Sequence, residues 1–359
     1  EFEYTDQNYL RSIYAINTGF EQKKFRGYIN FYSEQDSKNS TGDLELSDEQ
    51  KRILSAAGDD FLTAVVPGID TLEAFSSFRA MYQLVDTLLD CGIRDTILVY
   101  STNPDSAFYV ARFSFVGNGN GNYMLDASQV ANERVYKWVP PDPVNCQPRG
   151  NFEPVVQLVA PEQRRMLTLG GEYLLGKKSS VKAEIALSQN DQNRFSRLDK
   201  ADDAGLAAFT AFNKTFQLSK DSSGWQLETD LSYEFVEKNF QPLNPYRSAE
   251  FTRDWNLSAA TSGINTESFQ EQIARGGFNL VKSRLGRLEY NLSSFTRGSV
   301  YEGLMHQGRF QLQRSGWEID AVGNWLSIRG ENESSNFSRP KASVSKTFRK
   351  LNDWKVGVY

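Results

Sequence analysis

Acidic side chains offer the clearest potential for chemistry in this chain, and one short stretch concentrates them. Asp199, Asp202 and Asp203 lie close together in a polar segment between two predicted strands. Carboxylate oxygens at this density could hold Ca²⁺, which prefers hard oxygen ligands. The spacing matches no EF-hand loop, because the glycine and the terminal glutamate of that loop are missing. A solvated acidic loop is therefore the alternative that the sequence favours.

Catalytic chemistry finds little support elsewhere. The single histidine, His306, lies beside Leu304 and Met305 in a predicted strand, with no second histidine for a metal site and no serine motif for a triad. The run 117–122 has glycine at every second place but no following helix signal, so it lacks the context of a dinucleotide-binding loop. We expect no catalysis and no cofactor, and a structural or lumen-facing His306. A membrane-embedded hydrolase that uses His306 is the weaker alternative.

The remaining charged residues alternate with apolar ones, and this alternation predicts the elements that position them. Side chains of a β-strand point to opposite faces with a period of two, so each such segment has one apolar and one charged face. The predicted charged, lumen-facing side carries Glu172, Lys182, Glu184, Glu228, Asp230, Glu234, Glu289, Glu318 and Asp320. The predicted apolar, lipid-facing side carries Leu167, Leu169, Val181, Ile185, Leu187, Trp225, Leu227, Leu231, Tyr233 and Phe235.

Strands of this kind repeat to the end of the chain. They are predicted over 164–175, 179–190, 204–218, 224–238, 248–259, 267–282, 286–297, 302–313, 316–329, 336–349 and 352–359. A soluble β-sandwich also has one apolar face per strand, but these strands are long and their polar faces carry full charges. This favours an antiparallel transmembrane β-barrel with lipid outside and a wet lumen. The charged residues then make the lumen mildly cation-favouring, or they are only the wet side of a plugged bore; both readings stay open.

Several features agree with a bilayer setting. Early connections alternate between short ones, at 176–178 and 219–223, and long ones, at 191–203 and 239–247, as in barrels with tight turns on one side. Arg253 falls on the predicted apolar face of its strand, so we expect it near a headgroup boundary. There, a lipid-facing arginine destabilises a barrel by only about 0–1 kcal/mol. An interfacial girdle is predicted for Trp225, Trp255, Trp317, Trp325 and Trp354.

The composition narrows the class of protein. The chain has 359 residues, a formal net charge of -5 and 24% charged residues, so it lacks both a nucleic-acid footprint and a polybasic lipid-binding signal. The mean hydropathy of -0.52, with no run of about 18 apolar residues, excludes a helical membrane protein. It does not exclude a barrel, whose strands place a polar residue beside each apolar one.

The N-terminal half divides into a hairpin and an insertion. Residues 1–35 form a barrel-type hairpin that turns at 21–24, and 164–359 supply the barrel strands. Between them, 36–163 is predicted as a structured, mixed α/β insertion, either a small subdomain or a functional cap or plug. Within it, Ser47 and Gln50 form a capping box that predicts a helix over 48–57, ended by Gly58. Strands are predicted over 96–100, 107–116 and 135–139.

The two cysteines and the two ends of the chain indicate the cellular compartment in which the protein works. Cys91 and Cys146 both fall in the insertion, where they could form a disulfide in an oxidising compartment or remain two unrelated thiols. No signal peptide precedes Glu1, and the chain opens and stops inside predicted strands. We therefore expect a fragment of a longer exported protein.

Four phrases carry a resemblance to a known family. They are Glu1–Tyr9, Tyr32–Ser40, Val135–Pro141 and Gly171–Asp199. In these phrases, over roughly residues 1–210, the chain resembles a family of large, mostly uncharacterised outer-membrane β-barrel proteins of Bacteroidota. The resemblance implies a longer parent chain with further strands, and it brings no catalytic motif.

Two hypotheses of different classes follow. The first is an outer-membrane β-barrel segment in a Gram-negative envelope, acting as a pore, transporter or surface-assembly component; its partners are outer-membrane lipid and other envelope proteins, not nucleic acid. The second is a soluble or surface-exposed β-rich protein that binds a glycan or a protein through 36–163. The two differ in what Leu169, Ile185 and Leu231 contact: lipid in the first, protein in the second.

Overall fold

The computed structural model describes residues 10–38, 46–89, 92–129, 132–220, 224–257, 268–330, 334–348 and 354–358. The chain divides into two compact units. The insertion unit comprises the described parts of 1–11, 36–162 and 192–199, and the sheet unit those of 12–35, 163–191 and 200–359. The fold is mainly β, with 59% strand and 4% helix, as predicted. The expected opening strand at Glu1–Tyr4 and Cys91 lie outside the described residues.

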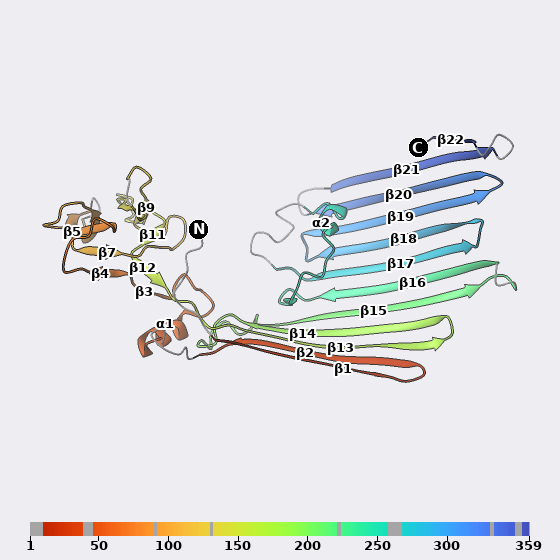
Figure 1. Cartoon of the computed structure of the whole chain (residues 1–359), viewed down its shortest axis with the longest axis horizontal. Helices are drawn as coiled ribbons and strands as arrows, with labels where there is room; N and C mark the ends of the chain where they lie inside the picture. Colours follow the sequence, from red (N-terminus) through yellow and green to blue (C-terminus); the bar gives the residue numbers. More distant parts are fainter. Residues whose placement is uncertain are drawn as a thin grey trace. The chain divides into compact units, whose positions relative to one another are not determined.

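The sheet unit is built on one twelve-stranded antiparallel sheet (Figure 1). Its strands follow in the order β1 (Arg11–Glu21), β2 (Phe25–Asp36), β13 (Gln163–Gly176), β14 (Ser179–Asp191), β15 (Ala204–Gln217), β16 (Trp225–Val236), β17 (Glu271–Lys282), β18 (Gly286–Arg297), β19 (Tyr301–Arg314), β20 (Trp317–Gly330), β21 (Ser334–Phe348) and β22 (Trp354–Val358). Each strand pairs with its neighbours in this order, so β1 and β22 are the two edges among the described residues. The sheet is antiparallel, and over the described residues no pairing between β1 and β22 closes it into a barrel.

The register explains why alternation in sequence becomes two distinct faces. Opposite residues of antiparallel strands share a face, and here Leu169 of β13 lies opposite Ile185 of β14, while Gly170 lies opposite Glu184. The same parity continues from strand to strand along the sheet. A one-residue shift would exchange the two faces, so the pattern itself specifies the pairing.

Most predicted strands are confirmed within a few residues. The N-terminal hairpin is β1 and β2, and the strand predicted at 286–297 has those bounds in β18. The prediction over 248–259 is wrong. A short helix, α2 (Phe251–Asp254), replaces it, and Arg253 is exposed in an ion pair with Glu250 (2.7 Å). The reason is a shared period: Phe251 and Trp255 are four residues apart, a spacing that fits one face of a helix as well as one face of a strand.

Connections at the two ends of the sheet differ in length. At the turn end, adjacent strands are joined through 22–24, 177–178, 218–224, 283–285, 315–316 and 349–353. At the loop end, they are joined through 37–162, 192–203, 237–270, 298–300 and 331–333. Every long connection therefore leaves from the loop end, and beyond residue 270 both ends have short connections.

The insertion unit is a set of short strands with one helix. Its elements are α1 (Asp48–Ala57), β3 (Val65–Pro67), β4 (Ile69–Thr71), β5 (Met81–Leu88), β6 (Arg94–Tyr100), β7 (Tyr109–Ala111), β8 (Ser114–Phe115), β9 (Tyr123–Leu125), β10 (Tyr136–Trp138), β11 (Phe152–Glu153) and β12 (Val155–Gln157). The predicted helix is confirmed: Ser47 and Gln50 form the reciprocal capping box, and Gly58 ends the helix at φ 65°. The strands form sheets in the orders β4-β7-β5-β6, β10-β9-β11-β8 and β12-β3.

An aromatic cluster packs the centre of this unit. The Tyr82 hydroxyl accepts a hydrogen bond from the backbone N–H of Tyr136 (3.0 Å), and the Tyr123 hydroxyl accepts one from Leu98 (2.9 Å). Phe113 stacks on Tyr136, with 4.5 Å between ring centroids. This packing corrects the strand predicted over 107–116, because Phe113 turns into the cluster and β7 and β8 on either side belong to different sheets.

Candidate functional site

Within the described residues, no layer of protein covers the apolar face of the sheet. All the predicted lipid-facing residues share it by register, and none of them is buried. The exposed fraction is 43% for Leu169, 48% for Ile185 and 58% for Leu231. Trp225, Trp317, Trp325 and Trp354 lie on the same face, whereas the prediction for Trp255 is wrong, because that side chain is buried on the opposite side. Their contact with lipid remains a prediction.

The polar face carries every predicted lumen-facing residue. It also holds basic side chains that the sequence analysis did not consider. On β17 to β21 these are Arg275, Arg287, Arg297, Arg309, Arg339 and Lys341. The acidic residues dominate strands β13 to β16, and the basic ones gather on β17 to β21. The face is thus mixed in charge, and the expected preference for cations applies to its acidic part.

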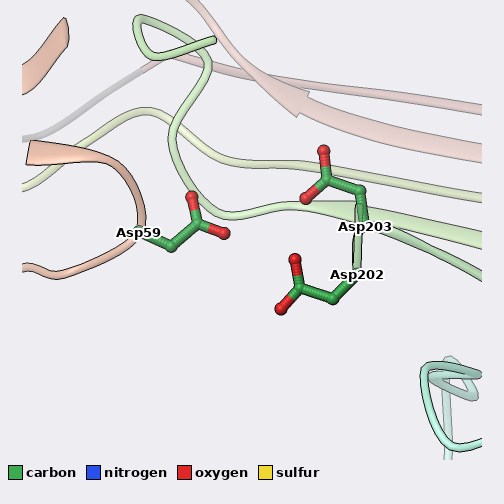
Figure 2. A group of neighbouring side chains, drawn as sticks. All are labelled: Asp59, Asp202 and Asp203. Carbon is green, nitrogen blue, oxygen red and sulfur yellow. The ribbon is translucent and has the colours of Figure 1, made fainter. Parts of the chain in front are cut away.

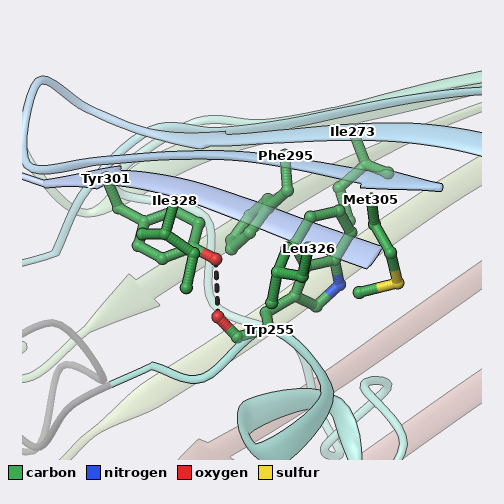
Figure 3. Packing of buried hydrophobic residues seen from close by; sticks show 7 residues of the cluster. All are labelled: Trp255, Ile273, Phe295, Tyr301, Met305, Leu326 and Ile328. Atoms are coloured by element: carbon green, nitrogen blue, oxygen red, sulfur yellow. Dashed lines mark hydrogen bonds between the residues drawn. The ribbon is translucent and has the colours of Figure 1, made fainter. Parts of the chain in front are cut away.

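At the loop end, part of the polar face is covered by the connection after β16 (Figure 3). Trp255, 4% exposed, packs against Phe295, Met305 and Leu326. The Tyr301 hydroxyl donates a hydrogen bond to the main-chain carbonyl of Trp255 (2.5 Å). These side chains come from β18, β19 and β20, so segment 237–257 is anchored on three adjacent strands. We call this segment the polar-face cap.

An ion cluster anchors the same cap. The two terminal nitrogens of Arg247 pair with Glu234 Oε1 (2.5 Å) and Glu271 Oε2 (2.8 Å). The guanidinium also stacks on the rings of Tyr246 (4.6 Å) and Phe251 (4.7 Å). Burial raises the pKa of the Tyr246 hydroxyl to about 12, so this group stays neutral at physiological pH. Charge pairing and stacking together fix the cap to β16 and β17.

Between the cap and β13 to β16 lies a hollow of about 350 Å³. Apolar residues, among them three alanines and three aromatic rings, line most of it, and Glu184 and Glu234 are its charged residues. Its volume falls in the range of small-molecule sites, roughly 300–1,000 Å³. Sequence reasoning missed both the hollow and the cap. Small residues on the polar face, at Gly205, Ala186 and Ala207, were the available signal.

The acidic loop does not assemble the predicted calcium ligands within one unit. Asp202 and Asp203 precede β15 in the sheet unit (Figure 2), whereas Asp199 belongs to the insertion unit, where its Oδ2 accepts from the backbone N–H of Asp59 (3.4 Å). Lys200 pairs with Asp191 (2.7 Å) and Asp203 (3.5 Å). Burial raises the pKa of the Asp203 carboxyl, partly opposed by Lys200. The ammonium supplies the positive charge there, and calcium binding stays a prediction.

His306 and the cysteines have separate surroundings. His306 lies on the apolar face, not the polar one: it stands opposite Leu292 and Trp325, and its Nδ1 is 2.7 Å from the Tyr290 hydroxyl. A lumen-facing role is therefore excluded, and a structural one remains. Cys146 is disulfide-bonded, and no free cysteine occurs in the described part of the chain. Because Cys91 lies outside the described residues, its pairing stays a prediction.

Comparison with known proteins adds no family. In the described ranges, no helix is long and apolar enough to cross a membrane. No protein-family model and no curated protein sequence matches this chain.

Proposed function

We propose that this chain is a segment of an outer-membrane β-barrel in a Gram-negative envelope, acting as a pore, transporter or surface-assembly component with no catalysis of its own. The observation that carries the proposal is the uncovered apolar face of the twelve-stranded sheet. Its large apolar side chains are exposed over most of the strands, from Ile16 in β1 to Val358 in β22.

Exposure on this scale is unfavourable in water. Burying one large apolar side chain contributes about 1.5–3 kcal/mol, and soluble monomers rarely expose contiguous apolar patches above a few hundred Å². Lipid tails remove this penalty, because they are as apolar as leucine. The charged polar face supports the same proposal, since ionised groups need water on their side of the sheet.

The connections support it as well. Barrels of the outer membrane have tight turns at one end and long loops at the other. Here all the long connections leave from the loop end, and strands of 12–15 residues, such as β16 and β21, exceed the roughly 9–11 residues that a bilayer requires. The surplus would let strands project beyond the hydrocarbon on the loop side.

A quenching experiment tests the proposal. The native cysteines are replaced by serine, a single cysteine is placed at Ile185, and a fluorophore attached there is studied with the full chain in vesicles. Brominated lipids should quench it strongly, because Ile185 lies on the apolar face. The matched control carries the label at Glu184, the next residue, on the polar face, and should be quenched mainly by iodide in water.

Equal quenching by lipid at both positions, or by iodide at both, contradicts the proposal. Extraction from cells that produce the protein gives a second readout. Release with the soluble periplasmic contents, without detergent, would instead favour a soluble or surface-exposed binding protein.

A further inference from the structure

We propose that the hollow under the polar-face cap binds a small organic cation, such as a quaternary or alkyl ammonium ion. This inference deepens the proposed function, because it names a class of ligand for the polar face. It rests on that function in one respect: the ligand must reach the hollow from water on the polar side of the sheet. The hollow lies entirely within the sheet unit.

The floor of the hollow is made by two neighbouring rows of the sheet. One row crosses four strands at Thr168, Ala186, Ala207 and Val236. The next row places Glu184, Phe209 and Glu234 side by side. The alanines leave a depression between bulkier neighbours, so a ligand resting there contacts the flanking carboxylates and the Phe209 ring.

The wall is a fixed part of the cap. At Gly205, a Cβ atom would lie 2.2 Å from the backbone nitrogen of Phe240, so the cap rests directly on β15. The backbone N–H of Gln241 donates to Ser188 Oγ (3.0 Å), and that of Leu206 donates to Glu237 Oε2 (3.0 Å). Phe240, Leu243 and Tyr246 then line the hollow from this anchored backbone.

The charge of the hollow selects the sign of its ligand. Arg247 neutralises Glu234, whereas Glu184 receives only a hydrogen bond from the Tyr28 hydroxyl and has no ion pair within the described residues. No lysine or arginine is among the described lining residues. One negative charge thus remains uncompensated beside an apolar floor, and a bound cation would offset it.

The aromatic lining selects the kind of cation. Ring faces attract cations, and alkylated ammonium ions gain most because they give up little hydration. Tyr246 already stacks on one cation, the Arg247 guanidinium, at 4.6 Å. Phe209 and Tyr246 are 37% and 49% exposed, so their rings are accessible. A compact inorganic ion would gain less from rings and alanines than an ammonium ion with methyl groups.

Three probes of one shape isolate the charge. Choline, 3,3-dimethylbutan-1-ol and 3,3-dimethylbutanoate are cationic, neutral and anionic versions of a similar skeleton. Calorimetry on the full chain in maltoside micelles should give saturable binding of choline, with affinity about tenfold or more above either analogue. Phosphocholine detergents are avoided, since they carry the probed group.

Two variants locate the site. Glu184→Gln should weaken choline binding about tenfold or more while leaving the neutral analogue unchanged. Glu228→Gln, on the polar face outside the hollow, should retain wild-type affinity. Tyr246→Leu should weaken choline binding about three- to tenfold through loss of the ring face. Unchanged circular dichroism shows that each variant is folded.

The proposal is overturned if the folded chain shows no saturable choline binding, binds the neutral analogue equally well, or keeps its affinity in Glu184→Gln. Binding in micelles does not depend on where Ile185 lies in a vesicle. Loss of choline binding and loss of lipid quenching therefore report separately on this site and on the proposed function.

Discussion

The hydroxyl of Tyr301 donates a hydrogen bond to the main-chain carbonyl of Trp255 across 46 residues of sequence, with 2.5 Å between the two oxygens. Both residues are buried, at 3% and 4% exposure. A carbonyl just after α2 has no partner inside so short a helix, so the bond satisfies a group that burial would otherwise leave unpaired. One strand residue thereby fixes the point at which the cap meets the polar face.

Tyr301→Phe should destabilise the cap by about 1–3 kcal/mol, because it leaves the Trp255 carbonyl buried without a partner. Tyr233→Phe is the matched control, since its hydroxyl bonds Gln272 on the exposed face (2.8 Å) and its loss should change stability by less than about 0.5 kcal/mol. Equilibrium unfolding in detergent measures both values. If the two variants lose the same free energy of unfolding, the hydrogen bond to the Trp255 carbonyl contributes no more to stability than an exposed one.

Trp255→Ala should cost about 3–5 kcal/mol, because it opens a cavity among Phe295, Met305 and Leu326. Trp325→Ala makes the same chemical change on the apolar face, where the side chain is 44% exposed, and should cost clearly less. Limited proteolysis in the cap should accelerate only in Trp255→Ala. Similar protease sensitivity in both variants would contradict the role of Trp255 as the anchor.

Arg247→Met should cost about 1.5–3 kcal/mol, because it leaves the partly buried Glu234 carboxylate without its cation, whereas Glu271 keeps its pair with Arg297 (3.5 Å). Arg253→Met, which removes the exposed pair with Glu250, should cost at most about 1 kcal/mol. Denaturant unfolding provides the comparison. Adding Glu234→Gln to Arg247→Met should restore part of the lost stability, because it removes the unpaired charge. If the losses of the two substitutions simply add, the unpaired charge is not the cause.

The sequence predicted the strands well because one physical rule governs them. Apolar residues such as Leu169 lie on one face of the sheet and charged residues such as Glu184 on the other. Side chains point alternately to the two faces, so each strand must alternate apolar and polar residues. The same rule explains the failures. Ile273, Phe295 and Leu326 are apolar residues on the polar face. They are buried there because Trp255, from a separate part of the chain, packs on them. Their departure from alternation was a signal for a covered region that the sequence analysis did not use, and it does not show that residues 251–257 cover it.

The site was predictable only in part, for a related reason. Alternation placed Glu184 and Glu234 on the polar face, and register then puts them in one row, on either side of Phe209. The hollow beside them depends on where the cap backbone rests, which Gly205 permits and no local pattern reveals. The capping box of Ser47 and Gln50, in contrast, acts within one helical turn and was readable directly.

The insertion unit should lose stability as pH rises above about 4.5. Glu153 is half-buried, and desolvation raises the pKa of its carboxyl above the ordinary value of 4.5, despite a hydrogen bond from the Asn122 N–H (2.7 Å). The folded state then binds more protons than the unfolded state between the ordinary and the raised pKa, so stability falls through that window with rising pH. The pH dependence of this stability is measured by hydrogen exchange of residues 114–125 in urea, corrected for the intrinsic exchange rates.

Glu153→Gln should flatten this pH dependence. Asp126→Asn is the control, because hydrogen bonds from Ser128 lower the pKa of that carboxyl and its effect has the opposite sign, with stability lost as pH falls. The downward slope above pH 4.5 should therefore persist in Asp126→Asn. A slope that also persists in Glu153→Gln would assign the effect to another group.

Leu231→Arg distinguishes lipid from water on the apolar face. Leu231 is 58% exposed near the middle of β16, so in water an arginine there should change stability by no more than about 0.5 kcal/mol. In a bilayer the same change should cost about 2–4 kcal/mol at mid-depth. Asn213→Arg is the control: it lies exposed on the polar face opposite Asp230, where a positive charge is acceptable in either setting. Refolding into vesicles gives the comparison, and a tolerated Leu231→Arg would contradict burial of that face in hydrocarbon.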